Sequence, residues 1–203
     1  MKVTLYIAKF ISYLFHPLLL PILGLLIIFN HPEMKLWVPG KETQNFLIAF
    51  TFVATFLLPL VNALFLLKMK QITSLSMTTK EERRIPYLIT TFFYSIQLYY
   101  VIKMEVPAVI KAIMLSATLV VAAILIINLF WKISAHMAGI GALSGIMLAL
   151  SYRLQINLLP IIILLFLISG LVAFSRLRLN AHNEAQVYAG FGLGIFIQLF
   201  LFF

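Results

Sequence analysis

The chain has 203 residues, of which 63% are hydrophobic and only 10% are charged. A soluble domain is nearer half apolar and a quarter charged, so the composition excludes an ordinary soluble fold and predicts an integral membrane protein. The absence of Cys excludes disulfides and thiolate metal sites, and the formal net charge of +9 indicates anionic lipid headgroups and membrane topology, with no nucleic-acid partner.

Seven stretches are long and apolar enough to cross a bilayer, which takes roughly 20 residues. They lie at about 4–29, 45–67, 87–104, 108–131, 134–152, 157–174 and 184–202. The sequence therefore predicts an all-α polytopic transmembrane bundle of about six or seven spans, as a single transmembrane domain over 1–203. His16-Pro17 and Pro21 predict a kink or break in the first span, and Pro86 is expected to open the third.

Small residues recur at helical spacing in two later spans. The fifth span contains Gly141 and Gly145, and the seventh contains Gly190 and Gly194. Such pairs let helices approach closely, so we expect them at a helix–helix contact.

Alternating spans place the N-terminus and three polar loops on one membrane face. These loops are predicted at 68–86, 131–134 and 175–183. About ten of the fifteen Lys and Arg residues fall on that face: Lys2, Lys9, Lys68, Lys70, Lys80, Arg83, Arg84, Lys132, Arg176 and Arg178. The positive-inside rule makes this face cytoplasmic, although cations held for a site would bias the same count.

The same face gathers the chemically distinctive residues in three segments, 79–86, 132–136 and 175–186. Arg84, Arg176 and Lys80 would give a phosphate several charged donors. His136 and His182 could divide the nucleophile and general-acid roles. The chain has no Asp to form a cluster for Mg²⁺ or Ca²⁺, so the residues favour phosphoryl transfer without a metal or cofactor.

Each segment also has a simpler interpretation. The segment 79–86 is by itself typical of a basic patch that touches lipid headgroups. Ser134, at a helix start, is commonly a helix cap. His16 and His31 each precede a proline without a partner pattern, and we expect His16 to be a packed or interfacial residue. Asn128, inside a span, is expected to bond between helices.

The third segment carries the most specific pattern. Ser175-Arg176 is followed after five residues by His182 and after three more by Gln186. This resembles the third motif of the type 2 phosphatidic acid phosphatase superfamily, which also includes the vanadium haloperoxidases. That motif reads Ser-Arg, five residues, His, three residues, Asp, so Gln186 stands where the family has Asp.

The other two segments are similar to the first and second family motifs. Ser134-Ala135-His136 keeps the Ser and His of Pro-Ser-Gly-His. Lys80 and Arg84-Ile85-Pro86 keep the residue types of a motif that reads Lys, six residues, Arg-Pro, at altered spacing. The resemblance covers roughly residues 68–200.

The resemblance implies a role for each matching residue. His182 would be the nucleophile that takes the phosphoryl group, and His136 would protonate the leaving lipid alkoxide. The phosphate-binding groups would be Arg176, Arg84, Lys80 and Ser134. The implied substrates are membrane lipid phosphates such as phosphatidate, phosphatidylglycerophosphate or polyprenyl pyrophosphates. Separately, a single compact bundle of spans is common in bacteria, so the expected location is a bacterial inner membrane.

Gln186 is the main departure from the family. Residues four apart share a helix face, so Gln186 is predicted to reach the His182 ring and to fix its tautomer. It carries no charge to stabilise an imidazolium, and a comparable Asp-to-Asn change in serine proteases costs about 10⁴ in rate. Glu81 or Glu82 is a candidate replacement for the charge.

Two other functions stay open at this point. The departure favours, as an alternative, a catalytically inactive relative that binds or transports phosphorylated lipids. A channel or solute transporter is the third, and its pathway residues should lie at mid-membrane. The sequence does not predict an oligomeric state.

Overall fold

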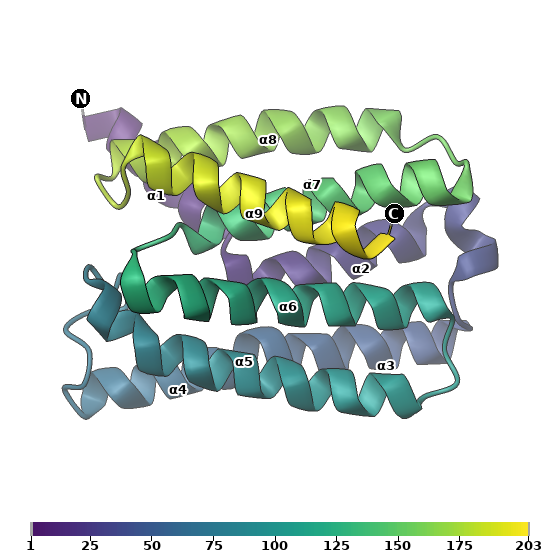
Figure 1. The fold of residues 1–203 in the computed structure, drawn as a ribbon, viewed down its shortest axis with the longest axis horizontal. Helices are drawn as coiled ribbons and strands as arrows, with labels where there is room; N and C mark the ends of the chain where they lie inside the picture. Colours follow the sequence, from purple (N-terminus) through teal and green to yellow (C-terminus); the bar gives the residue numbers. More distant parts are fainter. Residues whose placement is uncertain (1, 203) are drawn as a thin grey trace. The chain divides into compact units, whose positions relative to one another are not determined.

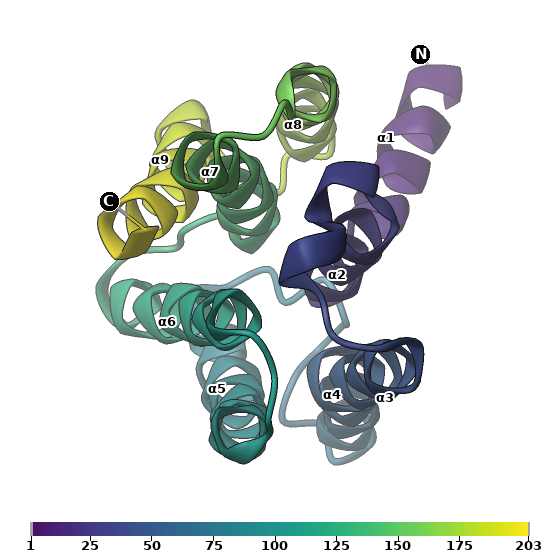
Figure 2. The same cartoon turned by 90° about the vertical axis from the view of Figure 1, so that its right-hand side faces the viewer.

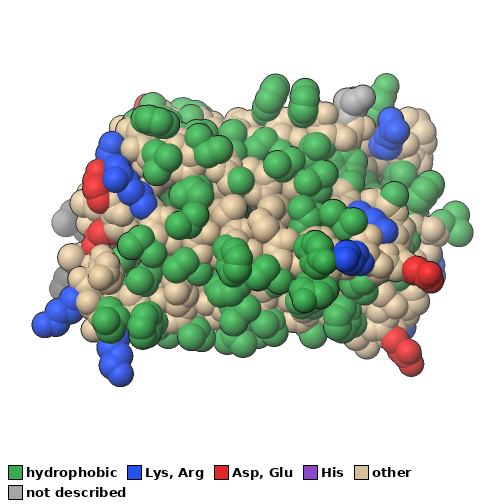
Figure 3. Space-filling model, turned by 60° about the horizontal axis from the view of Figure 1, so that its bottom comes forward, with side chains coloured by type: hydrophobic (Ala, Val, Ile, Leu, Met, Phe, Trp, Pro, Cys, Tyr) green, Lys and Arg blue, Asp and Glu red, His purple; other side chains and the backbone are tan. Residues whose placement is uncertain are grey.

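The computed structural model describes residues 2–202. Over this range it contains helices and short loops, with no strand. Within the same residues, seven helical stretches are long and apolar enough to span a membrane: Val3–Asn30, Lys41–Lys68, Lys80–Lys103, Ala108–Phe130, Ala135–Leu154, Leu159–Arg178 and Glu184–Phe202. The predicted all-α polytopic fold is confirmed, and the stretches indicate an integral membrane protein. Figure 3 shows many hydrophobic side chains spread over one face of the molecule and few charged ones.

The chain divides into two compact units. Unit 1 comprises Met1–Leu20 and Lys132–Phe203, and unit 2 comprises Pro21–Trp131. The helices of unit 1 are α1 (Lys2–Leu14), η1 (Pro17–Leu19), α7 (Ala135–Leu154), α8 (Leu159–Arg178) and α9 (Glu184–Phe202). Those of unit 2 are α2 (Leu20–Asn30, whose first residue belongs to unit 1), η2 (Pro32–Trp37), α3 (Lys41–Thr51), η3 (Phe52–Leu57), α4 (Leu58–Lys68), α5 (Lys80–Lys103) and α6 (Ala108–Phe130).

In unit 1, α7 packs along α9, and α1 packs on α8 (Figures 1 and 2). The α7–α9 contact depends on glycines. A Cβ on Gly190 would lie 2.6 Å from the Ser134 carbonyl oxygen, and one on Gly194 would collide with the Ala138 carbonyl oxygen. A Cβ on Gly141 would likewise collide with the carbonyl oxygen of Phe191. The predicted role of these glycines in helix packing is confirmed.

The first span is broken, as its prolines predict. α1 ends at Leu14, and His16 is extended with φ −64° and ψ 133°. Pro17 disfavours the helical conformation for the residue before it and fits the first position of η1. A second helix, α2, then begins at Leu20, with Pro21 in its first turn.

The start of α5 corrects the prediction that Pro86 opens the third span. The helix begins at Lys80, where Thr79 and Glu82 form a capping box. Thr79 Oγ1 accepts from the Glu82 N–H, and Glu82 Oε2 accepts from the Thr79 N–H, both at 3.4 Å. The capping box satisfies two backbone N–H groups at the start of the helix. This outweighs the loss of one backbone hydrogen bond at Pro86, which lies in the second turn and has no N–H.

The third polar segment is also less loop-like than predicted. α8 continues through Ser175 and Arg176 to Arg178, so only 179–183 form the loop. Asn180 takes the left-handed conformation, with φ 49°. Its N–H donates to the Leu177 carbonyl at 2.9 Å, and the Ala181 N–H donates to the Arg176 carbonyl at 3.1 Å. This pair of bonds is a Schellman motif, which ends helices at an Asn or Gly.

In unit 2, the second span contains a π-helical turn, η3, that the sequence did not predict. It lies shortly before Pro59, whose missing N–H interrupts the regular ladder. Beside it, Gln97 of α5 donates from Nε2 to Thr51 Oγ1 at 2.6 Å, and Thr55 Oγ1 donates to the Thr51 carbonyl at 2.9 Å. These buried polar groups satisfy one another within unit 2.

Candidate functional site

A cluster of polar side chains forms where four elements of unit 1 meet. It lies at the end of α1, the start of α7, the end of α8 and the start of α9. Its members are Ser12, His16, Ser134, His136, Ser175, Arg176, His182 and Gln186. The cluster therefore includes most of the residues predicted for the site, together with Ser12 of α1 and His16, which precedes η1.

His182 stands just before α9 and is 8% exposed. Asn183 caps the helix by accepting the Gln186 N–H on Oδ1 at 3.0 Å. The Gln186 side chain folds back, so that its Oε1 lies 2.8 Å from His182 Nδ1 and 3.4 Å from the Asn183 N–H. The predicted reach of Gln186 to the ring is confirmed.

This geometry fixes the tautomer of His182. The backbone N–H of Asn183 can only donate, so the amide oxygen of Gln186 must face it. The same oxygen can only accept from His182, whose Nδ1 therefore carries the proton. In the neutral ring the lone pair then lies on Nε2, the atom that would attack a phosphorus centre.

The end of α8 is tied to α1. Ser175 is fully buried, and its Oγ donates to the Ala8 carbonyl at 2.5 Å. Arg176 donates from a terminal guanidinium nitrogen to Ser12 Oγ at 2.5 Å. Ser175 therefore joins two helices, while Ser12 orients the guanidinium of Arg176.

The start of α7 brings in His136. Its Nε2 lies 3.1 Å from the main-chain carbonyl oxygen of Ser12, which can only accept, so Nε2 carries a proton. Its ring meets His16 edge-on, with centroids 5.4 Å apart and planes at 78°. Arg176 and His182 also lie close enough to His136 to act on it electrostatically.

Ser134 is a helix cap. It is fully buried, and its Oγ accepts the Met137 N–H at 3.4 Å. Its own N–H donates to the Gln186 carbonyl at 3.3 Å, which ties the start of α7 to that of α9. These contacts match the simpler interpretation of Ser134, and its bond to a phosphate stays a prediction.

The charge balance of unit 1 favours an anion. By sequence, the unit carries one carboxylate side chain, Glu184, which is exposed. Its cationic side chains are Lys2, Lys9, Lys132, Arg153, Arg176 and Arg178. A concentration of one sign of charge raises the local concentration of ligands of the opposite sign.

Lys80 and Arg84 belong to unit 2, where they cover the end of α6. Lys80 Nζ donates to the Phe130 carbonyl at 3.1 Å, and Arg84 donates to the Leu129 carbonyl at 3.5 Å. Cations at a helix C-terminus are electrostatically favourable. Asn128 completes the junction by donating to the Lys80 carbonyl at 2.8 Å, so its predicted bond between helices is confirmed. The phosphate-binding roles of Lys80 and Arg84 stay predictions.

The two carboxylates proposed to replace the missing Asp are also engaged within unit 2. Glu82 Oε1 accepts from the N–H and hydroxyl of Thr73, both at 2.6 Å, in addition to its capping role. Glu81 Oε1 lies 4.0 Å from Arg84. Their contacts explain both residues without a role toward His182.

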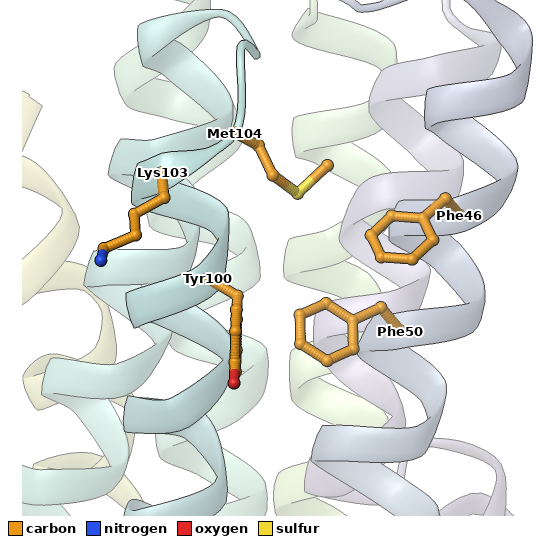
Figure 4. Close-up of a pocket in the computed structure, with 5 residues that line it drawn as sticks. All are labelled: Phe46, Phe50, Tyr100, Lys103 and Met104. Atoms are coloured by element: carbon orange, nitrogen blue, oxygen red, sulfur yellow. The ribbon is translucent and has the colours of Figure 1, made fainter.

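A separate groove of about 470 Å³ lies in unit 2, between α3 and the end of α5 (Figure 4). Phe46 and Phe50 face Tyr100 and Met104 across it, while the Lys103 amine points away. The Lys103 amine donates to the Tyr99 hydroxyl at 2.7 Å and lies 4.4 Å from the centroid of the Tyr99 ring. The lining is apolar and offers no group for acid–base or nucleophilic chemistry.

No family model, curated protein or solved structure matches the chain. The resemblance to the type 2 phosphatidic acid phosphatases therefore rests on the three sequence motifs alone.

Sequence reasoning missed Ser12 and His16. Ser12 contributes partly through its main-chain carbonyl, which has no residue-type signal. His16 had a visible signal, since it immediately precedes the proline that breaks the first span. Only the packing of η1 against α7 shows that this break brings its ring to His136.

Proposed function

We propose that the protein is a metal-independent lipid phosphate phosphatase that acts through a phosphohistidine at His182. The observation that carries the proposal is the bond from His182 Nδ1 to Gln186 Oε1 at 2.8 Å. It puts the proton of the neutral ring on Nδ1 and the lone pair on Nε2, in a cluster that also holds Arg176 and His136. The substrate class is a phosphatidate-, phosphatidylglycerophosphate- or polyprenyl-pyrophosphate-like lipid in a bacterial inner membrane.

The first step transfers the phosphoryl group to the enzyme. His182 Nε2 forms a bond to phosphorus as the bond from phosphorus to the lipid oxygen breaks. Arg176 holds the non-bridging oxygens, which a guanidinium can bind two at a time. His136 gives its proton to the leaving oxygen. Because its Nε2–H is bonded to the Ser12 carbonyl, the transferred proton would come from Nδ1, which requires a second proton on the ring.

The second step returns the enzyme to its starting state. Water attacks phosphorus and gives a proton to Nδ1 of His136, while the bond between nitrogen and phosphorus breaks and phosphate is released. Positive charge develops on the His182 ring in the first step and is lost when the second step breaks the bond from nitrogen to phosphorus. The carbonyl dipole of Gln186 stabilises this charge less than a carboxylate would. A slow enzyme is therefore expected.

The uncharged Gln186 also favours one alternative, a relative that binds or transports phosphorylated lipids without hydrolysing them. Such a protein would use Arg176 and the histidines to hold the headgroup. It would not need a charged partner for His182. The two functions share the anion site and differ in whether the bond to phosphorus breaks.

Phosphate release from a lipid panel separates the two functions. The purified protein in nanodiscs is given short-chain phosphatidate, phosphatidylglycerophosphate and a polyprenyl pyrophosphate. We expect release by wild type and a loss of at least about 10³-fold in His182→Ala, since removing a nucleophile typically costs that much or more. His31→Ala, in unit 2, is the matched control and should retain wild-type release.

The outcomes are distinct. If His182→Ala releases as much phosphate as wild type, hydrolysis through this site is wrong. If wild type releases none from any lipid but binds one of them, the binding alternative replaces the enzyme.

A further inference from the structure

The break in the first span places His16 beside the proposed general acid. The chain leaves the helical conformation after α1, and Pro17 begins η1, which packs on α7. The contact is close, because a Cβ on Gly139 of α7 would lie 3.6 Å from the Pro17 side chain. This packing places the centroid of the His16 ring 5.4 Å from that of the His136 ring.

The local backbone also fixes which nitrogen of His16 carries a proton. The Leu18 N–H donates to His16 Nδ1 at 3.4 Å, so in the neutral ring the proton lies on Nε2. His16 thus presents an N–H donor whether it is neutral or charged. His136, by contrast, has its Nε2–H on the Ser12 carbonyl.

The surroundings of His16 point to an anion. The ring is half-buried, lies within electrostatic reach of Arg176 and contacts His136. The single carboxylate side chain of unit 1 belongs to Glu184, which is exposed in the first turn of α9. A third imidazole is not needed, because His182 serves for attack and His136 for protonation of the leaving group. A third donor is useful to a phosphoryl group, which presents several oxygens at once.

We propose that His16 is a further anion-binding residue of this site, donating from Nε2 to a phosphoryl oxygen of the bound lipid. The inference rests on the proposed function for the location of the phosphoryl group. It makes the break in the first span, at Pro17, a functional part of the site. The competing role is packing alone, in which an apolar side chain of similar size would serve as well.

Orthovanadate, a phosphate analogue, tests the proposal in the full chain in nanodiscs. Gln places an amide N–H near the position of Nε2, whereas Leu fills the space without a donor. We expect His16→Leu to weaken vanadate binding by about ten- to a hundredfold, the usual worth of a hydrogen bond to a charged group. His16→Gln should retain affinity within a few-fold of wild type.

His31 provides the matched control. It also precedes a proline and starts a 3-10 helix, but in unit 2. His31→Leu should bind vanadate as wild type does. A second measurement needs no variant, because the ¹⁵Nε2 resonance of His16 should shift when vanadate is added to wild type.

Two results would overturn the inference: wild-type affinity in His16→Leu, or a His16 resonance that vanadate leaves unmoved. A wild type that does not bind vanadate would overturn it as well. Failure of the proposed function is seen separately. Vanadate binding that depends on His16, without phosphate release from any lipid, would retain the inference and reject the hydrolase.

Discussion

At the residue scale, Gln186 determines the chemistry available to His182, because its oxygen accepts from Nδ1 at 2.8 Å. Gln186→Leu removes that acceptor and frees the ring to adopt the other tautomer. We expect phosphate release to fall by about 10²- to 10⁴-fold, since loss of tautomer control in serine proteases costs about 10⁴. Gln186→Glu keeps the acceptor and adds a charge, so it should match or exceed wild type.

Gln71→Leu, in an exposed turn of unit 2, controls for the general effect of the substitution. Thermal unfolding of each variant separates loss of chemistry from loss of fold. Unchanged release by Gln186→Leu would contradict the proposed role of this hydrogen bond.

The same cluster shows how far residue patterns can predict a site. The bond between His182 and Gln186 was predictable, since a spacing of four places both on one helix face. The carbonyl of Ser12 was not, because every residue has one and only packing selects which is used. Lys80 and Arg84 fit a motif by type, yet they bond to the last carbonyls of α6.

At the element scale, the α7–α9 contact depends on the absence of side chains on α9. Gly194→Ala would place a Cβ against the Ala138 carbonyl and 2.5 Å from the Ala142 nitrogen. Neither backbone group can move alone, so we expect a loss of about 1–3 kcal/mol in the free energy of unfolding. Thermal or denaturant unfolding in detergent measures the loss.

Gly192→Ala is the matched control on the same helix. A Cβ there meets nothing within 4 Å, so the better helix propensity of Ala should stabilise α9 by about 0.5–1 kcal/mol. Equal destabilisation by the two substitutions would show that the α7–α9 packing is not as described.

The positions of the helices were predictable because a long apolar stretch is a strong signal for a span. The break in the first span was predictable because proline disfavours the helical conformation in the residue before it. Competition between neighbouring groups for backbone hydrogen bonds was harder to predict. The capping box at Thr79 moved the start of α5 ahead of Pro86, and the π-turn η3 gave no separate signal. Both depend on which backbone groups find partners.

At the scale of the whole molecule, the span count and the positive charges together predict an orientation. The span Lys41–Lys68 separates Lys35 from Ser76, both of which are exposed. Ser76 lies in the loop with Lys68, Lys70 and Lys80, which the positive-inside rule assigns to the cytoplasm. The loop 179–183 follows the sixth span, so alternation of the spans predicts the same face for it.

Single-cysteine labelling tests this orientation, because the chain has no Cys of its own. In right-side-out membrane vesicles, an impermeant maleimide should label Lys35→Cys and spare Ser76→Cys, and inverted vesicles should reverse the pattern. Labelling of both from one side would contradict the second span. A complete reversal would keep the spans and move His182 to the outer face. The orientation therefore decides which leaflet presents its phosphates to the site, since a lipid headgroup reaches only the face where it lies.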